Sequence, residues 1–140
     1  MRRYQFLRHT ADAKFRAFGS SLEEAFANAA LATASLMWDC QKIKERVEYK
    51  VTVEGRDLKQ MLVNFLEEIL YLFESKRFLL AVVDKINIKR EKNKFKLKAV
   101  FKGDKYKDIY IIHGDVKAIT YNEMKILNND HFTLQVVVDI

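Results

Sequence analysis

The chain has 140 residues, of which 49% are hydrophobic and 12% aromatic, enough to bury the core of one globular domain over residues 1–140. Its single cysteine, Cys40, excludes an intrachain disulfide, and the lack of proline with only four glycines argues against a disordered linker or a second domain. No apolar run approaches the roughly 20 residues that span a bilayer, and no signal sequence opens the chain, so we expect a cytoplasmic protein without a membrane partner.

The net charge of +6 at pH 7 is concentrated in one segment. Residues 85–107 hold ten Lys or Arg and two acids, so this segment carries +8 and the rest of the chain −2. Such a patch attracts nucleic acid or an acidic protein, although charge alone favours a merely solubilising strand face. Lys94, Lys96 and Lys98 in this segment, and Lys117 beyond it, are candidate contacts with a partner or RNA.

The first part of the chain contains two short strands and a helix. Residues 3–8 and 13–18 are predicted strands on either side of the turn His9-Thr10-Ala11-Asp12, because apolar and polar residues alternate along the second of them. Ser21 and Glu24 then form a capping box, and apolar residues recur beyond it at helical spacing. We expect this helix to pack closely on a sheet through its small residues.

A further strand and helix follow. Residues 46–54 alternate valine or tyrosine with polar side chains, which predicts a strand. Asp57 and Gln60 form a second capping box, and the helix beyond it carries a broad apolar stripe. This stripe predicts the most buried helix of the domain.

The rest of the chain is predicted to consist of strands. They cover residues 78–88, 94–102, 108–112, 117–127 and 132–139, with turns at 91–94, 103–104 and 128–130 and a kink near Asn122. The order of elements lacks the regular alternation of a parallel nucleotide-binding fold. We therefore expect an α+β domain in which two helices pack on a mostly antiparallel β-sheet, in one layer or folded into two.

Two aspartates stand at predicted strand ends. Asp12 closes the first turn, and Asp139 ends the apolar strand 132–139, next to Ile140. If the first and last strands are neighbours, these carboxylates and the terminal carboxylate converge and repel one another unless a cation binds. An all-oxygen set suits calcium or magnesium, and His9 is a candidate for orienting Asp12. Spacing alone favours the plainer alternative, in which both aspartates are solvated or accept turn hydrogen bonds and His9 has no role.

Signatures of common enzymes are absent from the sequence. It contains no glycine-rich phosphate loop, no Walker motif, no paired cysteines for zinc and no nucleophile elbow. His9, His113 and His131 do not share the helical spacing of zinc ligands. A Cys40 nucleophile with His113 as its base has no local support, so we expect no catalytic residue.

Several segments together resemble the archease family over nearly the whole chain. They are His9-Thr10-Ala11-Asp12, Ser21-Leu22-Glu23-Glu24-Ala25-Phe26 with Ala29-Ala30, Met37 with Asp39, Leu62 with Phe65-Leu66-Glu67-Glu68 and Leu70, Lys117-Ala118-Ile119-Thr120-Tyr121, and Val137-Val138-Asp139-Ile140. Each segment alone is a weak signal, but their order and spacing are specific.

The resemblance implies an accessory protein, not an enzyme, that serves the RtcB-type tRNA-splicing RNA ligase. Such proteins promote guanylylation of the ligase and its multiple turnover, and they broaden the nucleotides that it accepts. The family pattern also implies a calcium-type ion, with magnesium as the alternative, on Asp12, Asp139 and Ile140. Two departures from the pattern, Arg8 and Asn122, leave these three residues in place, although Arg8 makes the local field less negative.

Two other functions compete with ligase activation. The basic segment 85–107 would suit a tRNA-binding protein that modulates a modification enzyme such as a tRNA cytosine methyltransferase, although no row of exposed aromatic residues is predicted to stack on bases. A small metal-dependent hydrolase would need a general base beside the ion, and only His9 is a candidate.

Overall fold

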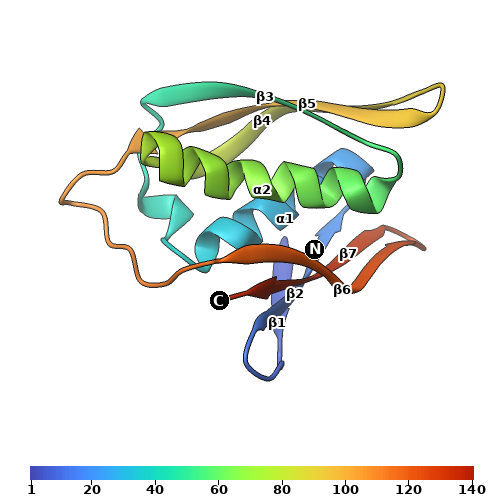
Figure 1. Ribbon diagram of the computed structural model, residues 1–140, viewed down its shortest axis with the longest axis horizontal. Coiled ribbons are helices and arrows are strands. Elements are labelled where there is room, and N and C mark those ends of the chain that lie inside the picture. Colours follow the sequence, from blue (N-terminus) through green and yellow to red (C-terminus); the bar gives the residue numbers. More distant parts are fainter.

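The computed structural model describes residues 1–140 and shows three layers, in which two helices lie between two β-sheets (Figure 1). The elements in chain order are β1 (Tyr4–Leu7), β2 (Ala13–Gly19), α1 (Leu22–Ser35), the short 3-10 helix η1 (Cys40–Lys42), β3 (Val47–Gly55), α2 (Leu58–Lys76), β4 (Phe78–Glu91), β5 (Lys94–Lys105), β6 (Ala118–Asn128) and β7 (Phe132–Asp139). Neither α-helix combines the length and the apolar character needed to cross a bilayer.

The strands form two separate antiparallel sheets. Sheet A has the order β1-β2-β7-β6, and sheet B has the order β3-β5-β4. α1 contacts β2 in sheet A and β4 in sheet B, and α2 contacts β6 and β3, so each helix is covered on two sides. The predicted α+β class is confirmed, and the second layer of strands is an independent sheet on the far side of the helices (Figure 1).

Both helices begin at the predicted caps. The Ser21 hydroxyl accepts the backbone N–H of Glu24 at 3.1 Å, and the Asp57 carboxylate accepts that of Gln60 at 2.8 Å. The side chains of Glu24 and Gln60 each accept the N–H of the residue before the cap, both at 2.7 Å, one position earlier than in a capping box. α1 is rich in buried alanine because a helix between two sheets needs small side chains to approach both of them.

Aromatic side chains connect the layers of the core. The rings of Phe26 in α1 and Phe65 in α2 lie 6.0 Å apart between centroids, and Phe65 lies 5.5 Å from Phe101 of β5. All three side chains are fully buried. The apolar stripe of α2 therefore contacts both its neighbouring helix and sheet B. The prediction that α2 is the most buried helix is wrong: nine of the 14 residues of α1 are buried, against seven of the 19 of α2, because α1 lies more deeply between the two sheets.

The predicted turn at Gly103-Asp104 is wrong. β5 continues to Lys105 and pairs Asp104 with Leu79 of β4. The glycine allows close approach of two strands, because a Cβ on Gly103 would lie 1.9 Å from the carbonyl oxygen of Leu79. A glycine followed by an aspartate is typical of a turn, but here both residues lie within β5 and pair with β4.

The predicted strand at residues 108–112 is also wrong. The segment is irregular and pairs with no strand of either sheet. Tyr110 is buried, whereas Ile109 and Ile111 are 67% and 74% exposed. The alternation of residue types therefore reflects one anchoring side chain in a loop between the two sheets, and not one face of a sheet.

Asp104 anchors this loop, which links β5 to β6. Its carboxylate is almost fully buried and accepts hydrogen bonds from Tyr110 Oη at 2.6 Å, Lys107 Nζ at 2.9 Å and the Lys105 N–H at 2.9 Å. Burial raises the pKa of Asp104, but these hydrogen bonds outweigh burial, so its pKa lies below the usual value. The folded protein thus favours the charged form of this side chain.

Asp104→Asn is expected to lower the free energy of unfolding by about 1.5–3 kcal/mol near neutral pH, the range for hydrogen bonds to a charged group. Because the pKa is lower in the folded than in the unfolded state, this contribution is present above the ordinary value of 3.8 and is lost as the pH falls through the folded pKa. Urea denaturation at about pH 7 and about pH 3 should show a smaller difference between wild type and variant at the lower pH. Asp108→Asn, in the same loop but exposed, should match the wild type. Equal differences at both pH values would contradict the charged role of Asp104.

Candidate functional site

Strand register brings Asp12 and Asp139 to the same end of sheet A. β7 pairs with β2, and β1 takes the edge position beyond β2. The last pair of this ladder joins Ala13 to Val138, and Asp12 and Asp139 come next on the two strands. On its other side, the Asp139 carbonyl accepts the backbone N–H of Lys117 at 2.7 Å. The two aspartates therefore lie on adjacent segments although they are at opposite ends of the sequence.

The turn before β2 brings His9 against Asp12. Ala11 has a left-handed backbone with φ of 65°, which is uncommon for a residue with a side chain and folds the segment back on itself. The His9 ring donates from Nδ1 to Asp12 Oδ1, and the two side chains are 23% and 19% exposed. The structure thus places His9 in contact with Asp12, the position in which an orienting residue would lie.

A further carboxylate, Glu123 of β6, contacts the other side of the His9 ring. His9 Nε2 donates to Glu123 Oε2 at 2.7 Å, and Glu123 Oε1 accepts from Lys14 Nζ at 3.0 Å. Sequence reasoning missed Glu123, because it reaches the site through an irregularity in the pairing of β6 with β7. The predicted kink near Asn122 marked this irregularity, but only the register shows which side chain it turns toward His9.

This arrangement shifts the pKa of both partners. Hydrogen bonds from His9 and then Lys14 lower the pKa of Glu123 to about 2. The hydrogen bonds to Glu123 and then Asp12 raise the pKa of His9 above 6.5. Both ring nitrogens face carboxylates, so neither is free to take a proton from water. The one candidate base of a metal-dependent hydrolase is therefore already engaged.

The donor atoms at this end of sheet A suit a hard divalent ion. His9 hydrogen-bonds to one carboxylate oxygen of Asp12, Oδ1, so Oδ2 is left to bind an ion. Asp139 and Ile140 are exposed at the same end of the sheet. No group of three or more His, Cys, Asp or Glu side chains is arranged to hold a metal. An ion here would bind two carboxylates, with main-chain oxygens and water completing the shell, a set that calcium and magnesium accept. The ligand roles of Asp12, Asp139 and Ile140 stay predictions.

The candidate contact lysines lie in two separate places. Lys94, Lys96 and Lys98 alternate along β5 with residues that face the helices, so they lie on the outer face of sheet B. Lys117 is exposed, directly precedes β6 and donates its backbone N–H to Asp139. It thus lies at sheet A, which is on the other side of the helix layer from sheet B (Figure 1). Of these four lysines, only Lys117 therefore lies next to Asp139 along the backbone.

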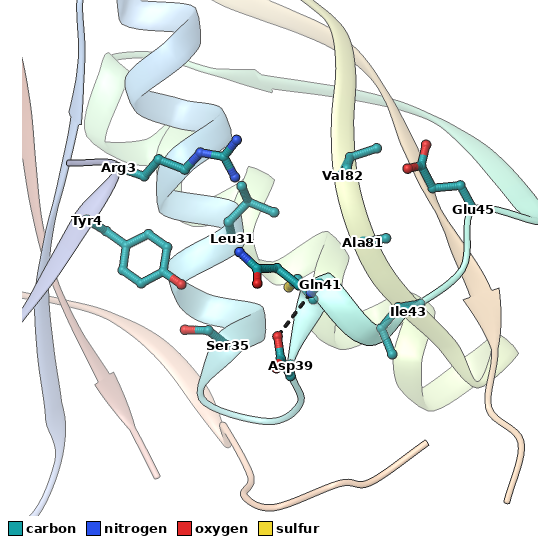
Figure 2. A pocket seen from close by; sticks show the side chains of 11 residues that line it. Arg3, Tyr4, Leu31, Ser35, Asp39, Gln41, Ile43, Glu45, Ala81 and Val82 are labelled. Carbon is teal, nitrogen blue, oxygen red and sulfur yellow. Dashed lines mark hydrogen bonds between the residues drawn. The ribbon is translucent and has the colours of Figure 1, made fainter. Parts of the chain in front are cut away.

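A pocket of about 580 Å³ lies away from this site, between β1, α1, η1 and β4 (Figure 2). Arg3 and Tyr4 line one side of it, and none of the predicted site residues contributes. Cys40 also lines this pocket, but burial raises the pKa of its thiol to about 12, so the thiol is protonated and a poor nucleophile. His113 lines a different pocket. The structure thus offers no support for a Cys40–His113 pair.

Known proteins similar to this chain share one family description. A family model described as "Archease protein family (MTH1598/TM1083)" matches residues 4–140. Proteins named "Protein archease" from Methanosarcina mazei and Pyrococcus furiosus are 36% and 37% identical to this chain, covering 99% and 100% of it and 97% and 100% of their own lengths. The protein of that name from Pyrobaculum neutrophilum is 39% identical, over 98% of this chain and 95% of its own. The solution structure of Methanobacterium thermoautotrophicum protein 1598 covers both chains completely, with a TM-score of 0.86 and 29% identity.

Proposed function

Because the chain belongs to the archease family, we propose that it is a non-catalytic activator of the RtcB-type tRNA-splicing RNA ligase. In this role it promotes guanylylation of the ligase and its multiple turnover, and broadens the nucleotides that the ligase uses. The meeting of Asp12 and Asp139 on adjacent segments, beside Lys117, supports the proposal most directly. All three residues come from the segments that carry the family resemblance.

The end of sheet A would supply the working surface of this activator. Asp12 and Asp139 would bind a calcium or magnesium ion through carboxylate oxygens, and Ile140 would add a further oxygen. A bound ion would offer positive charge to anionic groups of the ligase or its nucleotide. His9 orients the Asp12 carboxylate, and Lys117 adds a cation at the same edge.

The outer face of sheet B gives less support to tRNA binding. Lys94 pairs with Glu54 at 3.0 Å and Lys102 with Asp84 at 3.1 Å, so part of its positive charge is already neutralised. Phe101 of β5 points into the core, where it cannot stack on bases. These features agree better with a solubilising strand face.

Multiple-turnover ligation by the RtcB-type ligase from the same source tests the proposal. With RNA in excess, product should exceed one equivalent per ligase only when this protein is present, and guanylylated ligase should accumulate in parallel. Omitting the guanine nucleotide provides the control, because activation through guanylylation then has no donor. Ligation that stays at a single turnover with the protein present would refute the activator role.

A further inference from the structure

We propose that Glu123 is a positioning residue of the carboxylate site, which holds the His9 ring so that Asp12 keeps one oxygen free for a divalent ion. This inference rests on the proposed ion-binding role of Asp12 and adds a residue of β6 to the predicted set. Its basis is a continuous series of contacts, Lys14–Glu123–His9–Asp12, that joins β2, β6 and the turn before β2.

The His9 ring is held at both nitrogens. Nε2 contacts Glu123 Oε2 at 2.7 Å and Nδ1 contacts Oδ1 of Asp12, and the ring donates both hydrogen bonds as the doubly protonated imidazolium. Rotation of the ring would break both hydrogen bonds, so Glu123 fixes the direction from which His9 approaches Asp12. Oδ2 of Asp12 is then the oxygen left for an ion. Residues that orient metal ligands in this way typically change metal affinity by about 10–100-fold when they are replaced.

Glu123 reaches His9 because β6 bulges at this point. Between Thr120 and Lys125, four residues of β6 lie opposite a single residue of β7. Glu123 itself has a left-handed φ of 52°, which is uncommon for a residue other than glycine. Bulges redirect side chains and are frequent beside functional sites. The local backbone therefore directs this carboxylate toward the site at some conformational cost.

A buried glutamine fixes the bulge. Gln135 of β7 is only 2% exposed, and its Nε2 donates to the backbone oxygen of Glu123 at 2.7 Å. Its Oε1 accepts from Arg16 Nε at 3.0 Å, so both ends of the amide are bound. Thr120 accepts the N–H of Asn122 at 3.3 Å and supports the same segment. Because the bulge has its own buried polar support, it is part of the fold and not a fluctuation of an exposed strand.

An ordinary surface ion pair is the competing explanation, since the Glu123 side chain is 50% exposed. The two explanations differ in how Glu123 acts. A positioning residue affects the ion through the His9 ring, whereas a surface charge acts directly and does not need the ring. A double-mutant cycle between Glu123 and His9 separates them.

Calcium titrated into the intact chain, followed by isothermal titration calorimetry, gives the dissociation constants for the wild type, Glu123→Gln, His9→Gln and the double variant. We expect Glu123→Gln to weaken calcium binding by about 10–100-fold in the wild-type background. In the His9→Gln background the same change should have less than about a twofold effect, because the ring that transmits it is absent. Glu48→Gln, at an exposed glutamate in sheet B, is the matched control and should bind like the wild type.

Each other outcome overturns the positioning role in a distinguishable way. Wild-type affinity in Glu123→Gln would leave the proposed ion site intact and remove only Glu123 from it. Equal losses in both backgrounds would mean that Glu123 acts directly through its charge. If the wild type binds no calcium, the ion site fails together with this inference, and the ligation assay then decides separately whether activation survives without it.

Glu123→Gly separates the site from the stability of the fold. Glycine adopts a φ of 52° without strain, which offsets the loss of the Glu123 contacts with His9 and Lys14, so the melting temperature should change little while calcium binding weakens. A fall in melting temperature that accompanies the weaker binding would instead make Glu123 a structural residue and overturn the positioning role.

Discussion

Asp12→Asn is expected to return ligation to the rate of the ligase alone while the protein stays folded. Asparagine keeps the size of the side chain and one oxygen, but removes one of the two carboxylate charges proposed to bind the ion. The number of charged ligands sets affinity in all-oxygen sites, so the loss should be large. The substitution also deprives His9 of a charged acceptor, which disrupts the rest of the site.

Multiple-turnover ligation with parallel detection of guanylylated ligase measures this effect. Asp130→Asn is the matched control, because Asp130 is an exposed aspartate in the turn at the opposite end of the β6–β7 hairpin. It should activate the ligase like the wild type. Full activation by Asp12→Asn would separate the carboxylate site from the activator function, even if the wild type stimulates the ligase.

Trp38→Ala should have the largest effect on stability, about 3–5 kcal/mol, the range for removing a large buried aromatic side chain. Trp38 follows α1 and is fully buried. Its ring lies 5.2 Å from that of Phe73 in α2, and its indole N–H donates to the Leu80 carbonyl of β4 at 2.9 Å. One side chain thus connects both helices to sheet B.

Urea denaturation followed by far-UV circular dichroism measures this loss, since the variant has no tryptophan left for fluorescence. Trp38→Phe is the matched control: it keeps an aromatic ring but leaves the Leu80 carbonyl without its donor, at an expected cost of about 1–3 kcal/mol. An alanine variant as stable as the phenylalanine variant would show that the cavity is filled by neighbouring side chains.

Local patterns predicted most elements of the fold. The alternation along residues 13–18 and 46–54 and the caps at Ser21 and Asp57 depend on neighbours within a few positions, and the structure confirms them. The division of the strands into two sheets depends on pairings between distant segments, which periodicity does not encode. The order of strands and helices along the chain is as compatible with one folded sheet as with two separate sheets.

The missed contact of Glu123 and the wrong turn at Gly103-Asp104 have the same cause, which is contact between segments distant in the sequence. Glu123 contacts His9 across more than a hundred residues of sequence, and the backbone bulge that aims it carries no distinct residue pattern. The local sequence predicts a turn at Gly103-Asp104, because neither the approach of β4 nor the burial of Asp104 against Tyr110 is visible in it. The position of the Asp12–Asp139 pair was easier to predict, because both residues stand at strand ends.

Sheet A is built from strands at both ends of the chain, so its strands are synthesised at different times. Residues 22–105 contain both helices and all of sheet B, so they leave the ribosome before β6 and β7. β2 can pair with β7 only after β7 has been synthesised. Such long-range pairing forms late because it closes a long loop. A nascent chain that lacks β7 has no Asp12–Asp139 pair. Any ion bound there would therefore report that β7 has paired with β2.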